Sequence, residues 1–190
     1  MKIIGQKKLL AEIDHLLQDN NFPRYIIIQG PVGSGKKLIA SYVAQQLGAT
    51  FVPCELAVDS VRDVIELSYT QMDPTVYMWA DANKMSMAAK NAVLKITEEP
   101  PQNSYFIMTT DNVKGLLSTL LSRGTLFNIN PYTVSELKDF AKNKIPDSTD
   151  SSINTIINIS TTPLDVLMLA EIDVDKMNKV VSVLCDNIGS

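Results

Sequence analysis

Residues 25–38 read YIIIQGPVGSGKKL, and this stretch decides the fold class. Its first four residues form a short apolar run of the kind that builds a buried strand. Residues 30–37 follow as a glycine-rich loop, and residues 38–47 predict a helix. The order of strand, loop and helix is the context that a phosphate-binding loop requires. A plain glycine-rich turn is the less favoured alternative.

The chemistry of phosphate binding explains the spacing within this loop. Glycines let the backbone curl so that successive N–H groups point inward, and the helix N-terminus adds positive potential. The lysine at position 36 can reach the outer phosphates of ATP or ADP. The candidate nucleotide-binding residues are therefore Gly30, Gly33, Ser34, Gly35, Lys36 and Lys37.

The metal side of the site departs from the pattern at two positions. Lys37 stands where a Ser or Thr hydroxyl would hold Mg²⁺. After the apolar run of residues 76–79, Ala80 occupies the metal-facing position and Asp81 stands where a glutamate would activate water. We therefore expect weak nucleotide binding, a degraded Mg²⁺ site and no metal ligand. Asp81 is a candidate catalytic residue, although capping of the following turn is the favoured interpretation.

Further short apolar runs at residues 105–108 and 126–129 alternate with helix-like stretches, which is typical of a parallel sheet with crossover helices. Residues 51–53 supply a fifth strand, and their proline favours an edge position. Apolar spacing also predicts a helix over residues 6–18.

The pattern changes after Pro131. Thr133 and Glu136 form a capping-box signature that opens a helix through about Lys144. No strand pattern returns. Two further helices are marked by Ile153, Ile156 and Ile157, and by Met177, Val180, Val181 and Leu184. We predict an α/β domain over residues 1–130 and a small all-α domain over residues 131–190.

Composition excludes several classes of protein. The 190 residues are 45% hydrophobic and 20% charged, and no apolar run approaches the roughly 20 residues needed to cross a membrane. The N-terminus lacks the pattern of a secretory signal, so we expect a cytoplasmic location. A net charge of −4 provides no global attraction to DNA. Cys54 and Cys185 have no ligand-like neighbours, so neither a disulfide nor a zinc site is expected, and both are interpreted as apolar fillers.

Residues 81–101 read DANKMSMAAKNAVLKITEEPP. This stretch resembles the clamp-loader subunits of bacterial DNA polymerase III, AAA+ proteins that typically carry an Ala-Ala-x-Asn-Ala-Leu-Leu-Lys-x-Leu-Glu-Glu-Pro-Pro helix. The likeness extends to residues 4–6, 61–65, 109–112 and 120–123. It implies a AAA+ P-loop domain with a parallel five-stranded sheet, followed by a small helical lid domain. The zinc-binding insertion of the family and its C-terminal collar domain have no counterpart in the sequence.

The resemblance assigns roles to particular residues. Thr110 falls at the sensor-1 position, where a polar side chain can contact the terminal phosphate. The alternative is that its hydroxyl forms a hydrogen bond within a turn. Arg123 falls on the arginine that the family uses in trans as a finger toward a neighbour's nucleotide, and an ordinary surface salt bridge is the alternative. Gly124 replaces the cysteine that usually follows, which puts the loop packing in question. Asp165 stands where active members place a sensor-2 arginine, and its carboxylate would repel phosphate.

Within this family the chain most resembles the delta-prime type, whose nearest relative is the gamma/tau subunit. This resemblance implies a mostly non-hydrolysing scaffold within the DNA polymerase III holoenzyme that works with gamma/tau and delta subunits, and indirectly with the sliding clamp, and has no membrane role. Primer–template DNA could meet a positive edge of Lys84, Lys90, Lys95 and Lys114, although a solvated face is favoured. The alternatives are a weak, gamma-like ATPase that uses Asp81, and a P-loop kinase or other AAA+ protein of unrelated purpose.

Overall fold

The computed structural model describes residues 3–19, 21–146 and 148–172. They fall into two compact units. The first comprises the chain up to Pro31 together with Gly35–Asn130, and the second comprises Val32–Ser34 together with the residues from Pro131 onward. No helix among the described residues is long and apolar enough to span a bilayer.

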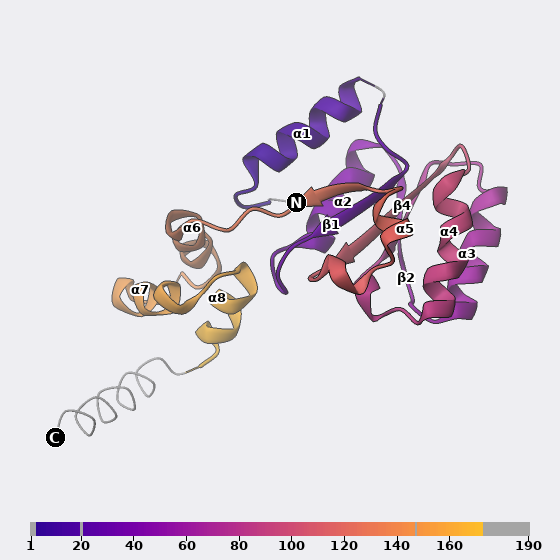
Figure 1. The fold of residues 1–190 in the computed structure, drawn as a ribbon. Helices are drawn as coiled ribbons and strands as arrows, with labels where there is room; N and C mark the ends of the chain where they lie inside the picture. Colours follow the sequence, from indigo (N-terminus) through magenta and orange to yellow (C-terminus); the bar gives the residue numbers. More distant parts are fainter. Residues whose placement is uncertain (1–2, 20, 147, 173–190) are drawn as a thin grey trace. The chain divides into compact units, whose positions relative to one another are not determined.

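The first unit is built on a five-stranded parallel sheet, which confirms the predicted fold class (Figure 1). Its order is β2-β3-β4-β1-β5, so the proline-containing strand β2 lies at an edge, as predicted. All carboxyl ends meet at one edge of the sheet, where open α/β sheets place their ligand sites. The strands are β1 (Tyr25–Gln29), β2 (Thr50–Cys54), β3 (Thr75–Trp79), β4 (Ser104–Thr110) and β5 (Thr125–Asn128).

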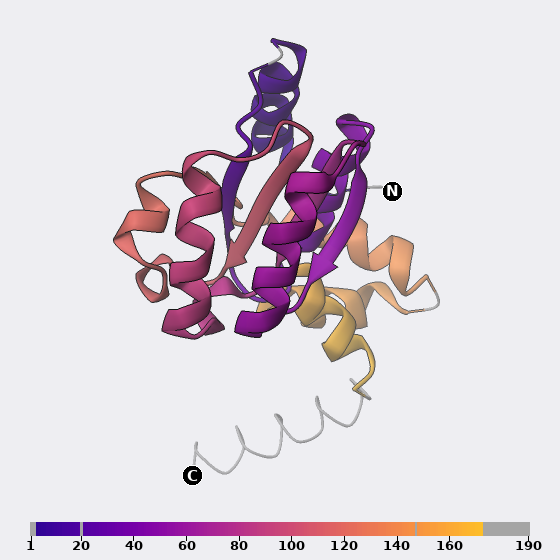
Figure 2. The same cartoon turned by 90° about the vertical axis from the view of Figure 1, so that its right-hand side faces the viewer.

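Helices cover both faces of the sheet, and those after β2, β3 and β4 share one face (Figures 1 and 2). On that face α3 and α4 lie side by side. Helices α1 and α2 are joined by a hydrogen bond from Tyr42 to Asp14. The elements of this unit are α1 (Lys7–Gln18), α2 (Lys36–Gln46), α3 (Val58–Thr70), η1 (Ala82–Lys84), α4 (Met87–Glu98), η2 (Val113–Gly115) and α5 (Ser118–Leu121).

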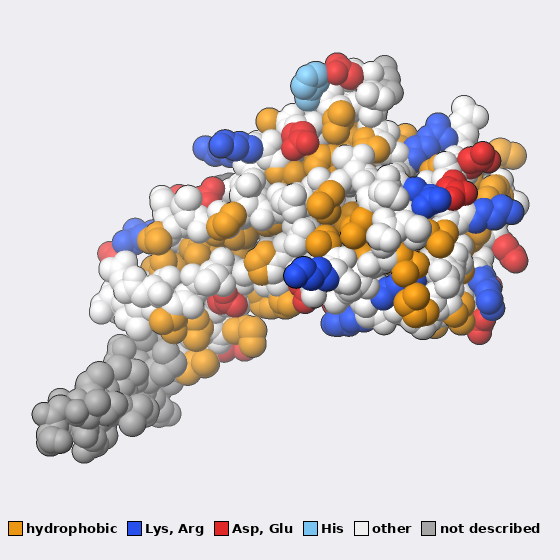
Figure 3. Space-filling model, viewed as in Figure 1, with side chains coloured by type: hydrophobic (Ala, Val, Ile, Leu, Met, Phe, Trp, Pro, Cys, Tyr) orange, Lys and Arg blue, Asp and Glu red, His pale blue; other side chains and the backbone are white. Residues whose placement is uncertain are grey.

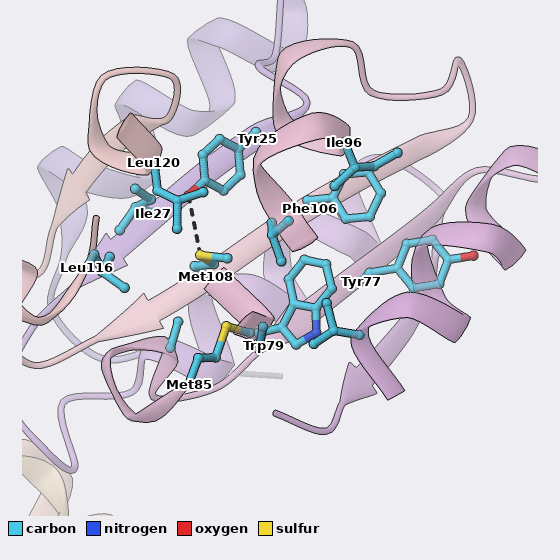
Figure 4. Close-up of a cluster of buried hydrophobic side chains, with 14 residues drawn as sticks. Tyr25, Ile27, Tyr77, Trp79, Met85, Ile96, Phe106, Met108, Leu116 and Leu120 are labelled. Carbon is cyan, nitrogen blue, oxygen red and sulfur yellow. Dashed lines mark hydrogen bonds between the residues drawn. The ribbon is translucent and has the colours of Figure 1, made fainter. Parts of the chain in front are cut away.

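A stack of aromatic rings forms the centre of the core (Figure 4). Side chains two residues apart on a strand point to the same face, so Tyr77 and Trp79 both face α3 and α4. The ring of Phe106 stacks against both, with centroid distances of 5.6 and 5.7 Å. This packing fixes β3 and β4 relative to each other, and with them the two loops that reach the candidate site.

The helices of the second unit are α6 (Val134–Lys144), α7 (Asp150–Ile159) and α8 (Pro163–Ala170). They pack around Phe140, Ile153, Ile157 and Val166. The predicted capping box is present: the hydroxyl of Thr133 accepts from the backbone N–H of Glu136, and the Glu136 carboxylate accepts in return. The helix predicted around residues 177–184 lies outside the described residues.

Candidate functional site

The glycine-rich loop has glycines at positions where the backbone is left-handed. Gly33 and Gly35 adopt φ angles of +77° and +86°, a region open to glycine and strained for other residues. Gly35 is the N-cap of α2. The loop begins beside the end of β4, because Gly30 N–H donates to the carbonyl of Thr110 at 3.1 Å. The loop therefore lies at the carboxyl edge of the sheet, between β1 and the helix that follows.

Lys36 lies against its own loop. Its side chain is 8% exposed, and its Nζ donates to the carbonyls of Gly30 and Pro31 at 2.7 and 2.8 Å. Burial lowers the pKa of Lys36 below its ordinary value, while the carboxylates of Asp81 and Asp111 oppose that change. The ammonium therefore has carbonyl partners at hand and two carboxylates in its electrostatic neighbourhood.

The loop has the residue types expected for phosphate binding, and its metal-side positions lack those expected for magnesium. Inward-pointing backbone amides, the start of α2 and a lysine are the groups that hold nucleotide phosphates. The metal-side positions carry an exposed Lys37 and an exposed Ala80, neither of which offers an oxygen side chain. Among the described residues, no three His, Cys, Asp or Glu side chains gather where they could hold an ion.

Asp81 follows β3 in the left-handed conformation, with φ of +52°. It occupies the N-cap position of η1, but within the described chain its side chain makes no capping hydrogen bond. Its carboxylate instead pairs with Lys84 at 3.0 Å, and its backbone N–H donates to the hydroxyl of Thr109 at 3.1 Å. The expected side-chain cap is therefore wrong, because the flexible Lys84 ammonium gives the carboxylate a charged partner instead.

Thr110 is fully buried at the end of β4. Its hydroxyl accepts from Asn112 N–H at 3.0 Å, and it lies 3.2 Å from Asn83 Oδ1 and 3.0 Å from the carbonyl of Asn112. One proton can serve only one of these acceptors, so the proton is already engaged by either Asn83 or the turn at Asn112. These are the contacts of a residue that holds the loops after β3 and β4 together.

Lys90 does not belong to a positive edge. Its side chain is 7% exposed, and its Nζ donates to the carbonyls of Asn83 and Gly115 at 3.1 and 2.7 Å. These carbonyls lie in η1 and η2, so the ammonium joins both turns to α4. Lys84 pairs with Asp81. On the face shown in Figure 3, basic and acidic side chains are interspersed.

Arg123 follows α5 on the surface of the first unit, 31% exposed. Its Nη2 donates to the Glu98 carboxylate at the end of α4, and its Nη1 donates to the carbonyl of Thr119 at 2.7 Å. Arg123 therefore takes part in a salt bridge within its own chain. A guanidinium has five N–H donors, so this pairing leaves donors for a further acceptor.

The backbone at Gly124 packs closely against side chains of β1. A Cβ added there would lie 2.8 Å from Tyr25 Cε1, closer than real Cβ atoms come, and 3.0 Å from Ile27 Cδ1, so these side chains would have to shift. The backbone after Arg123 thus lies directly on β1, and the side chains of Tyr25 and Ile27 fill the space that a cysteine would need.

Asp165 serves the fold of the second unit. It lies in the first turn of α8, where its carboxylate accepts hydrogen bonds from the backbone and hydroxyl of Thr161 and from Thr162 N–H, all at 2.8–2.9 Å. Burial alone would raise its pKa, but these hydrogen bonds outweigh it and lower the pKa. In the same unit Tyr132 donates to the carbonyl of Ser34 at 2.8 Å.

Several residues of this region escaped sequence reasoning. Asn83 and Asp111 approach Thr110 and Lys36 from adjacent turns, and Glu98 meets Arg123 from a helix 25 residues earlier. Gln6 is buried, and its side-chain amide exchanges two hydrogen bonds with the backbone of Asn130, at 2.8 and 2.9 Å. The signal for Glu98 was available: an acidic residue at a helix C-terminus needs a cation nearby.

Comparison with known proteins finds a matching family model and similar sequences. Residues 54–133 match the family described as "DNA polymerase III, delta subunit". The gamma subunit of Buchnera aphidicola from Schizaphis graminum is 26% identical over 172 residues, an alignment covering 74% of this chain and 47% of that protein. The delta-prime subunit of Haemophilus influenzae is 34% identical over 79 residues, covering 40% and 24% of the two chains. The chain thus spans less than half the length of these relatives.

Solved structures share the fold. The RuvB Holliday junction branch migration motor of Thermotoga maritima superposes with a TM-score of 0.74 at 22% identity, covering 94% of this chain and 64% of that one. A gamma-subunit-related protein of DNA polymerase III from the same organism superposes with a TM-score of 0.63 at 16% identity, covering 90% and 62%. The sequence matches agree with one another, and the chain is similar to clamp-loader subunits of DNA polymerase III.

Proposed function

We propose that the chain is a delta-prime-like subunit of the DNA polymerase III clamp loader, acting in DNA replication. In this role it hydrolyses little or no ATP itself. It presents Arg123 to ATP bound by a neighbouring gamma/tau-type subunit while the loader acts on the sliding clamp. The delta subunit and primer–template DNA are its further partners in the assembly.

The observation that carries this proposal is that the first unit lacks the expected metal ligands but holds an arginine at its surface. At the loop, the two metal-side positions hold Lys37 and Ala80, which cannot coordinate Mg²⁺. At the end of α5, the Arg123 guanidinium is held at the surface by two acceptors of its own chain. An arginine finger needs only a fixed, charged fork near another subunit's phosphates. It does not need a metal site in its own chain.

The decisive experiment assembles the chain with the gamma/tau and delta subunits of the same organism and measures ATP turnover with clamp and primed DNA. Because fingers in GTPases contribute ~10³–10⁵ in rate, we expect Arg123→Ala to lower turnover about tenfold or more. Arg62→Ala is the matched control, since Arg62 is an exposed arginine that also pairs with a carboxylate, Asp59. Equal turnover in the two variants would refute the finger role.

Nucleotide binding by the isolated chain is a separate part of the proposal. We expect calorimetry to detect weak ATP or ADP binding that is insensitive to Mg²⁺ and disappears in Lys36→Ala. The competing function is a weak, gamma-like ATPase that would use Asp81, a carboxylate that acts electrostatically on Lys36. Mg²⁺-dependent turnover that vanished in both Lys36→Ala and Asp81→Ala would establish that alternative and remove the scaffold proposal.

A further inference from the structure

The backbone on either side of Arg123 is fixed by the fold. Gly124 packs closely on side chains of β1, because a Cβ added there would lie 2.8 Å from Tyr25 Cε1. Its N–H and that of Arg123 both donate to the carbonyl of Leu120 at the end of α5, at 3.2 and 3.4 Å. The Cα of Arg123 is thus set by packing, and only the side chain remains to be oriented.

The far end of the side chain is oriented by Glu98 and by Thr119. Glu98 is the last residue of α4, and the chain just after it is held in turn: Arg24 donates to the carbonyl of Pro100 at 3.4 Å. A carboxylate at the C-terminal end of a helix opposes the helix dipole and favours a nearby cation. The backbone at the end of α4 is therefore held by contacts other than Arg123, and the charge of Glu98 attracts a cation to that point.

We propose that Glu98 is the positioning residue of the arginine finger. The inference rests on the proposed function of Arg123. In it, Glu98 holds Nη2 while the carbonyl of Thr119 holds Nη1, and the unused N–H groups of the guanidinium remain for phosphate oxygens of the neighbouring subunit's nucleotide. Glu98 does not touch the nucleotide. It reduces the freedom that a long side chain must otherwise lose when phosphate is contacted.

A purely structural pair would behave differently. If Arg123 served only to balance the charge at the end of α4, removing Glu98 would change the stability of the chain and leave the turnover of the assembly alone. If Glu98 orients the finger, its loss lowers the maximal rate, because the finger acts in the transition state. The KM for ATP stays constant, since ground-state binding takes place in the other subunit.

The test uses the assembled loader with five versions of this chain: Glu98→Ala, Glu98→Gln, Glu99→Ala, Arg123→Ala and the double variant Glu98→Ala/Arg123→Ala. Glu99 is the matched control, since it is the next carboxylate at the same helix end and makes no hydrogen bond or ion pair with any residue that the structure describes. The maximal rate and KM are measured for each, and Trp79 fluorescence verifies that each chain is folded.

We expect Glu98→Ala to lower the maximal rate about three- to fivefold, the upper part of the range that an exposed ion pair contributes. Glu98→Gln should fall between it and the parent, because an amide keeps the acceptor oxygen and loses the charge. Glu99→Ala should match the parent, and Glu98→Ala should have no further effect once Arg123 is alanine.

Four other outcomes would contradict the proposed role of Glu98. A loss in Arg123→Ala with Glu98→Ala equal to Glu99→Ala would overturn the positioning role and leave the finger standing. A faster rate in Glu98→Ala would overturn it too, since Glu98 would then compete with phosphate. An effect of Glu98→Ala that persisted without Arg123 would show that Glu98 acts by another route. No effect of Arg123→Ala would remove the finger and this inference with it.

Discussion

Lys90 should be worth more to the stability of this protein than any exposed lysine on the same helix. Replacing it with methionine keeps an unbranched stem of four atoms and removes the ammonium that binds the carbonyls of Asn83 and Gly115. Each buried acceptor left without a partner costs about 1–3 kcal/mol. Relief from burying a charge offsets part of that loss. We expect Lys90→Met to lower the free energy of unfolding by about 2–3 kcal/mol.

Urea denaturation of the full chain, followed by tryptophan fluorescence, measures this change. The single tryptophan, Trp79, lies in the core of the first unit and reports on its unfolding. Lys95→Met is the control, because Lys95 is exposed on the same helix, and it should change stability by no more than about 0.5 kcal/mol. Hydrogen exchange should also quicken in η1 and η2 of the Lys90 variant alone. If the two variants unfold at the same urea concentration, the reasoning about the buried ammonium is wrong.

Three further predictions concern packing and titration. Gly124→Ala should lower the free energy of unfolding by about 1–3 kcal/mol through overpacking against Tyr25, and urea denaturation with Ser122→Ala as control checks it. Asp165→Asn should lower the free energy of unfolding by about 1 kcal/mol near neutral pH. Folding lowers the Asp165 pKa, so the difference from the parent chain should vanish as the pH falls through the folded-state pKa, and melting curves at several pH values measure it. Burial raises the Cys54 pKa to about 11, so in a Cys185→Ser chain iodoacetamide should react slowly at pH 8 and faster toward pH 11; rapid labelling at pH 8 would contradict this.

The sheet was predictable because its signals are local. Apolar runs, a glycine-rich loop and the Thr133 capping box each lie within a few residues of sequence, and each appears where expected. The second capping box, Thr162 with Asp165, was equally local and was missed, because Asp165 was interpreted through a family position and not through its spacing from Thr162.

The site was less predictable because its contacts join distant parts of the chain. The charge of Lys90 predicts an exposed side chain. The side chain is buried instead, because backbone carbonyls of two turns accept hydrogen bonds from its ammonium. The Thr110 hydroxyl is occupied by its own turn and by Asn83 from the preceding loop. Helical spacing shows which face of α4 is apolar. It does not show that a charged residue on that face has backbone acceptors within reach.

The fold itself explains which site residues could change freely. Lys37 and Ala80 are exposed, so the metal-side positions can vary without disturbing the core. Gly30 and Gly124 are tied to strands β4 and β1, so their neighbourhoods are constrained by packing. Arg123 belongs to neither group: its ion pair is exposed and contributes at most about 1 kcal/mol to stability. Folding therefore gives little reason for an arginine at this position, and the phosphate contact proposed above would supply one.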